Sequence, residues 1–179
     1  MKTRILFAGI ATCLLTFGSV STYAASQGTL GFTSQGSVDI TVGVGDRVQI
    51  SGLDDIALGQ WSGTGALTGD EELCVYSSTS NYEITISGLH ASSTFALSAG
   101  GGTTLPYTVN WADDPGDATN GNRGITEGTP LTANVGNNTH FTCNGAINAT
   151  LRIHITEANL QAAVAGNYSD TLTINVSPE

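Results

Sequence analysis

Few side chains in this 179-residue sequence are suited to catalysis or metal binding, and they lie far apart along the chain. His90, His140 and His154 fall in three different segments, without the close pairing that metal sites and nucleophile–base pairs use. His154 stands between Ile153 and Ile155, so on a strand it faces the opposite side from them. We therefore expect no catalytic residue, no metal and no cofactor, and we do not expect an enzyme.

An acidic stretch, DDPGDATNGN at residues 113–122, offers carboxylates for a calcium site. Calcium loops of the EF-hand type need ligands at fixed alternate positions. Pro115 occupies one of those positions and has no ligand atom in its side chain. We interpret the stretch as a solvated, turn-rich loop.

The N-terminus has the pattern of a secretory signal peptide, which we assign to residues 1–24. Lys2 and Arg4 are followed by an apolar stretch at 5–20, and Thr22-Tyr23-Ala24 is a small-residue cleavage site. The apolar stretch is short, and no stop-transfer charges follow it, which argues against a membrane anchor. We expect the mature chain to be exported.

The mature chain is strongly acidic. It keeps three arginines (Arg47, Arg123 and Arg152) and no lysine against fifteen acidic residues, which gives a net charge of −12. Such a surface repels nucleic acids and anionic lipids.

Two cysteines, Cys74 and Cys143, remain when Cys13 is removed with the signal peptide. An even pair in an oxidising compartment predicts a disulfide. A loop of this length would stabilise the fold by about 4 kcal/mol in the chain-entropy model. The alternative, a metal or redox site, lacks a C-x-x-C spacing.

The composition favours short strands over helices. The chain has 23 glycines and is rich in Thr, Ser and Asn, and its alternating segments are separated by turn signals, as in an antiparallel β-sandwich. The stretch at 157–164 (EANLQAAV) is the only helix-like segment, of about two turns at most, and we interpret it in preference as an irregular crossover. Trp111 is assigned to core or rim packing. Trp61, beside a Gly-rich loop, is assigned to packing, with stacking on a sugar or an abiotic surface as the alternative. The expected strands cover residues 47–53, 56–59, 73–77, 82–87, 95–99, 107–111, 131–135, 151–155 and 168–176. The segments 73–77 and 82–87 are either two strands or one strand interrupted by a bulge.

A second alternating run precedes the body of the domain. Val38, Ile40, Val42 and Val44 place four β-branched side chains on one face, and Gly45-Asp46 then breaks the run. Leu30 and Phe32 could extend it toward the N-terminus. The final expected strand, 168–176, places Leu172, Ile174 and Val176 on its core face.

These segments together resemble the chaperone–usher pilins of the archaic branch, which carry a spore coat protein U-like domain. The resemblance rests on V-x-I-T-V-x-V at 38–44, V-x-I-S at 48–51, DIALG at 55–59, LPYTV at 105–109 and AGNYSDTLTINV at 165–176. It spans nearly all of the mature chain. The chain differs from that pattern in having Val48 and Ile50 where an early cysteine is frequent, and in its ending Ser177-Pro178-Glu179.

The resemblance implies an incomplete immunoglobulin-like antiparallel β-sandwich with an N-terminal donor-strand arm. It divides the chain into a signal peptide (1–24), an extension with the donor strand (25–45) and a pilin domain (46–179). Subunits of this kind polymerise by donor-strand exchange. The implied donor residues are Val38, Ile40, Val42 and Val44, and the implied wall of the receiving groove is formed by Tyr168, Leu172, Ile174 and Val176.

The partners implied by the resemblance are a periplasmic chaperone, an outer-membrane usher and neighbouring pilins, with a host glycan or abiotic surface as a further contact. The subunit is expected in a pilus on a Gram-negative cell surface, supporting adhesion and biofilm formation. The alternative hypothesis is a secreted, self-contained sandwich that binds carbohydrate, in which residues 25–44 form its own edge strand. A hydrolase is the third hypothesis, and no residue pair nominates it.

Overall fold

The computed structural model describes residues 25–113 and 123–179. The expected signal peptide (1–24) and most of the acidic loop (114–122) lie outside the described residues. The chain divides into two units, Met1–Val44 and Gly45–Glu179.

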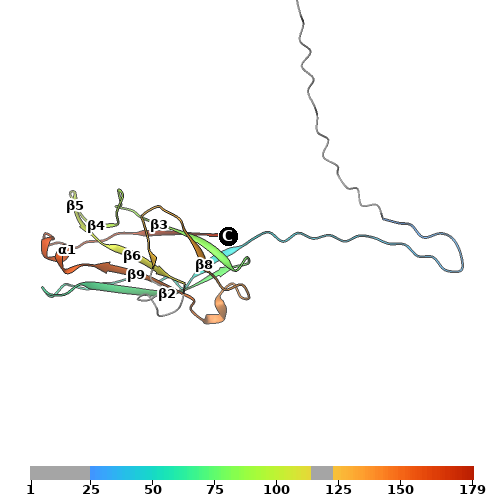
Figure 1. Cartoon of the computed structure of the whole chain (residues 1–179), viewed down its shortest axis with the longest axis horizontal. Helices are drawn as coiled ribbons and strands as arrows, with labels where there is room; N and C mark the ends of the chain where they lie inside the picture. The colour runs from blue at the N-terminus through green and yellow to red at the C-terminus, as the bar shows by residue number, and fades with distance from the viewer. Residues whose placement is uncertain (1–24, 114–122) are drawn as a thin grey trace, which may run out of the picture. The chain divides into compact units, whose positions relative to one another are not determined.

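The larger unit is made of antiparallel sheets (Figure 1). The five-stranded sheet has the order β1 (Val48–Ser51), β2 (Leu67–Ser77), β9 (Ala149–Ile155), β6 (Thr108–Ala112) and β7 (Arg123–Gly124). The three-stranded sheet has the order β10 (Leu172–Pro178), β3 (Asn81–Gly88) and β8 (Leu131–Val135), and β4 (Ala96–Gly100) pairs with β5 (Thr103–Pro106). The predicted all-β, antiparallel, sandwich-like fold is confirmed.

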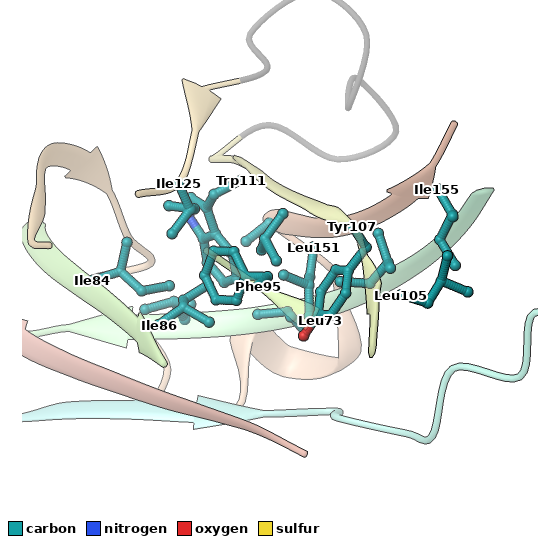
Figure 2. Packing of buried hydrophobic residues seen from close by; sticks show 14 of the residues in the cluster. Leu73, Ile84, Ile86, Phe95, Leu105, Tyr107, Trp111, Ile125, Leu151 and Ile155 are labelled. Carbon is teal, nitrogen blue, oxygen red and sulfur yellow. The ribbon is translucent and has the colours of Figure 1, made fainter. Parts of the chain in front are cut away.

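The core lies between the two larger sheets, and Figure 2 shows its side chains filling the space between the strands. Trp111 on β6 and Tyr82 on β3 are both 0% exposed and meet edge to face across the core. The interpretation of Trp111 as a packing residue is therefore confirmed. The largest fully buried aliphatic side chains are those of Leu73, Ile84, Ile86, Ile155, Val75 and Val109.

Three sequence expectations need correction. Strand β2 begins at Leu67, six residues before the expected start, because residues 67–70 pair with β9 although Gly69 and Asp70 indicate a turn. Residues 56–59 are not a strand. The final strand begins at Leu172 rather than Tyr168.

The stretch expected to be an irregular crossover contains a short helix, α1 (Glu157–Ala162). The Thr156 side chain accepts a hydrogen bond from the Asn159 backbone N–H and caps the helix N-terminus. Leu160 is buried and fixes the helix on the sandwich. A 3₁₀ turn, η1 (Cys143–Gly145), is the other helical element of the described residues. Neither is long and apolar enough to cross a membrane.

The sandwich has two distinct ends. At the proximal end, β1 begins beside the turn that joins β2 to β3, and β10 ends there, because Val48 pairs with Ser77 and Pro178 pairs with Tyr82. At the distal end lie α1, the β4–β5 pair and Leu172, where β10 begins; Figure 1 shows α1 and β5 at the opposite end from the terminus marked C. β1 therefore runs away from the proximal end and β10 runs toward it.

Candidate functional site

One edge of β10 is open along the whole strand. β10 pairs with β3 through all seven of its residues, and no other strand of the described chain pairs with its second edge. Thr173 and Asn175 are exposed, whereas Leu172, Ile174 and Val176 are half-buried and pack against the core. An open edge with apolar side chains beneath it is a template for pairing with another strand.

A second row of half-buried apolar side chains belongs to β1 and the chain that follows it. Ile50, Ile56 and Leu58 pack on the same core as the β10 row. Residues 52–58 run beside β2 without strand pairing, and Ile56 and Leu58 lie over Gly69 on the core-facing side of β2. β1 and β10 are neighbours in space, and Figure 2 shows both ribbons passing along the same side of the buried cluster. The two rows together form what we call the open-edge cluster, which consists of Ile50, Ile56, Leu58, Leu172, Ile174 and Val176.

The start of β10 is fixed by a part-buried contact at the distal end. The Tyr107 hydroxyl donates to Asp170 Oδ2 over 2.6 Å, and the His90 backbone N–H donates to Asp170 Oδ1 over 3.2 Å. Burial raises the pKa of Tyr107, and the hydrogen bond to the Asp170 carboxylate raises it further. Gly88 is needed here because a Cβ atom would lie 2.7 Å from Asp170 Oδ2.

Tyr168, predicted as part of the groove wall, lies before β10. The next residue, Ser169, forms a β-bridge with Ser98 on β4. The Tyr168 hydroxyl donates a hydrogen bond to the Val164 carbonyl over 2.7 Å. Its ring is half-buried and packs against the core. The expected wall residues that share the β10 strand are therefore Leu172, Ile174 and Val176.

The predicted donor residues are highly exposed. Val38, Ile40, Val42 and Val44 are 70%, 90%, 88% and 72% exposed, and residues 38–44 form no strand within the chain. Four β-branched side chains in contact with water are unfavourable for the isolated chain, and exposed apolar side chains gathered on one segment indicate an interaction site.

Leu30 and Phe32 do not extend this run, because the chain folds back between Ser26 and Ser37. These two serines exchange backbone N–H···O bonds of 3.0 and 3.1 Å, and their hydroxyls are 2.8 Å apart. We call residues 26–37 the N-terminal loop. A Cβ atom at Gly28 would lie 2.1 Å from Ser34 Oγ, so the two legs of the loop are in close contact. Leu30 and Phe32 lie at its tip and are fully exposed.

The predicted disulfide between Cys74 and Cys143 is present, with a sequence separation of 69 residues. It holds residues 137–146 against β2. The Asn148 side chain also bonds both backbone groups of Val75, at 2.8 and 2.9 Å. Within this segment Phe141 is 57% exposed and stacks on His140, with ring centroids 5.0 Å apart.

The remaining candidates stay apart in space or have structural partners. His90 follows β3, His140 lies in the disulfide-linked segment, and His154 bonds Thr68 on the outer face of β9. Among the described residues no three His, Cys, Asp or Glu side chains gather as metal ligands would. The Trp61 indole N–H donates to the Gly65 carbonyl over 2.8 Å, and its half-buried ring packs on the core.

The chain matches no protein-family model, and no curated protein shows significant sequence similarity to it. The features of the chain that indicate a function are the open-edge cluster and the exposed run at residues 38–44.

Proposed function

We propose that this protein is a structural pilus subunit that polymerises by donor-strand exchange, in which residues 38–44 of one copy pair with the open edge of β10 in the next. The single observation that supports this most strongly is a match of length and pattern. The exposed run and β10 are each seven residues long, about 23 Å of strand. Both alternate apolar with polar or small residues, so one strand can add to the other.

The direction of the donor strand follows from the two ends of the sandwich. Three residues, 45–47, separate the donor run from β1, so Val44 stays close to the proximal end of its own copy. A donor parallel to β10 would place Val44 at Pro178, which also lies at the proximal end of the receiving copy. The proximal end of each copy would then have to contact both the copy that receives its donor strand and the copy that donates a strand to it. An antiparallel donor joins the proximal end of one copy to the distal end of the next and lets the chain of subunits grow.

The pairing would remove two unfavourable features of the isolated chain, its exposed apolar side chains and its unpaired strand edge. It would bury the exposed β-branched side chains, each worth about 1.5–3 kcal/mol on full burial, and it would satisfy the open backbone edge of β10. Before assembly, the same edge requires temporary cover. A periplasmic chaperone that lends a strand, and an outer-membrane usher where the exchange takes place, would provide it. The filament would support adhesion and biofilm formation at the cell surface.

The proposal is tested by changing the donor side chains. Ile40→Asp combined with Val42→Asp places two charges where apolar side chains should enter the core, while Thr41→Asp changes the opposite face of the same run. In cells that also produce the chaperone and usher, we expect the double variant to be exported with its disulfide formed but to give no detergent-resistant ladder. The Thr41→Asp control should still polymerise. Ladders of normal length from the double variant would refute the donor assignment.

A self-contained carbohydrate-binding sandwich is the second candidate, favoured by the half-buried Trp61 beside the loop at 62–65. It requires residues 25–44 to act as an edge strand of their own sandwich. A stable monomer in which amides of residues 38–44 are protected from hydrogen exchange would support it.

A further inference from the structure

The tip of the N-terminal loop has no role in the donor strand as proposed above. Residues 38–44 already match β10 in length. Leu30 and Phe32 would therefore lie beyond the end of β10 in the receiving copy. The contact between Ser26 and Ser37 closes the loop at the residue before Val38. Two fully exposed large apolar side chains at the tip of a closed loop indicate a docking element.

The antiparallel donor fixes where this loop arrives. This step depends on the proposed function. When Val44 lies beside Leu172 of the receiving copy, Val38 lies beside Pro178, and Ser37 emerges at the proximal end of that copy. The N-terminal loop is about five residues deep on each leg, so its tip reaches roughly 15 Å from Ser37.

The receiving copy has a preformed hollow at this end. Its volume is about 380 Å³, within the range that small ligand sites occupy. It lies beside the paired residues Gln49 and Tyr76 and under the segment that the disulfide holds in place. The residues that line it are Arg47, Val48, Gln49, Tyr76, Thr139 and Phe141.

We propose that the Leu30–Phe32 tip of an arriving arm docks in this hollow of the receiving copy and forms a second joint beside the donor strand. Tyr76 and Phe141 offer ring faces and edges to Phe32, an arrangement that aromatic pairs favour. Arg47 makes no ion pair within the described residues, so its guanidinium is available to lie over an aromatic ring. The Asn137 side chain accepts N–H bonds from Thr139 and His140, which keeps the rim in shape before docking.

Site-specific photo-crosslinking in the assembled polymer tests the proposal. The photoreactive residue p-benzoylphenylalanine replaces Phe32 in one sample and Thr41 in another, and crosslinked peptides are identified by mass spectrometry. We expect position 32 to reach the neighbour's peptides that carry Tyr76 or Phe141, and position 41 to reach β10 of the neighbour. If position 41 reaches β10 and position 32 reaches any other place, the docking proposal is wrong while donor-strand exchange stands. If no polymer forms, or position 41 misses β10, both are wrong.

A double-mutant cycle provides an independent readout. Leu30→Ser with Phe32→Ser should leave polymers able to form but make them dissociate in detergent at a lower temperature. Tyr76→Ser with Phe141→Ser should cause the same shift, and combining all four changes should lower the temperature no further. Thr29→Ala with Thr33→Ala is the matched control at the same tip and should leave dissociation unchanged. Strictly additive shifts, or no shift from the tip variant, would overturn the docking contact.

Discussion

The Trp111 indole N–H donates to the Tyr82 hydroxyl over 2.9 Å, and this bond joins the two larger sheets through the centre of the core. Both side chains are 0% exposed. The two sheets are thus connected by a specific polar contact as well as by apolar packing.

Tyr82→Phe should lower the free energy of unfolding by about 1–3 kcal/mol, because it leaves the Trp111 N–H buried without an acceptor. Chemical denaturation of the mature chain measures the loss. Tyr168→Phe removes a hydroxyl whose bond to Val164 is exposed to water and should cost less than about 1 kcal/mol. Equal losses of unfolding free energy in the two variants would show that the buried Tyr82–Trp111 bond stabilises the fold no more than the exposed Tyr168–Val164 bond does.

Stability should fall in alkaline solution because of two buried tyrosines. Burial is the largest cause that raises the pKa of both Tyr82 and Tyr107 in the folded chain. Because the unfolded chain releases these protons near pH 10, their contribution is complete below about pH 10 and is lost as the pH rises further. Unfolding free energies measured across this range should fall less steeply in Tyr107→Phe than in the wild type. An unchanged slope would contradict this assignment.

Much of the fold can be predicted because apolar and polar residues alternate along most of the strands. The 107–111 expectation corresponds to β6, and 131–135 corresponds to β8. The sequence does not predict the first half of β2, because Gly69 and Asp70 are typical of a turn. The glycine is there instead because Ile56 and Leu58 occupy the space above it, a contact that no local pattern reveals.

The candidate site was predicted in part for the same reason. Apolar residues alternate with polar or small residues in the donor run and in β10, so the sequence alone indicates two strands that each have one apolar face. The closing of the N-terminal loop depends on Ser26 meeting Ser37, and the hollow depends on the disulfide placing Phe141 above β1 and β2. The available sequence signal for the hollow is an aromatic residue, Phe141, two residues before the cysteine at 143.

Gly69→Val should disturb the open-edge cluster. A Cβ atom at Gly69 would lie 2.5 Å from Ile56 Cγ2 and 2.7 Å from Leu58 Cδ2, so both side chains must move. We expect a loss of about 1–3 kcal/mol of unfolding free energy and fewer polymers per exported subunit. Gly124→Val, on β7, is the matched control, because a Cβ atom there meets nothing within 4 Å. A Gly69→Val protein that polymerises like the control would argue against a role for Ile56 and Leu58.

Removal of the disulfide by Cys74→Ser with Cys143→Ser should reduce the free energy of unfolding by about 4 kcal/mol, given the long loop that it closes. The denaturation midpoint of the double variant should match that of the reduced wild-type chain. A midpoint equal to that of the oxidised wild type would contradict the expected stabilisation.

Truncation of one open-edge residue tests the receiving side of the joint. Ile174→Ala removes a half-buried side chain beneath the open edge, whereas Asn175→Ala changes an exposed neighbour on the same strand. Polymers of the Ile174 variant should dissociate in detergent at a lower temperature than those of the Asn175 variant. Equal dissociation temperatures would mean that the donor does not contact this row.

The most direct measurement is the structure of the assembled filament at side-chain resolution by electron cryomicroscopy. We expect residues 38–44 of each copy to lie antiparallel to β10 of its neighbour, with Val38, Ile40, Val42 and Val44 turned into the neighbour's core. A filament in which the second edge of β10 is filled by residues of its own chain, or is left uncovered, would contradict donor-strand exchange by this subunit.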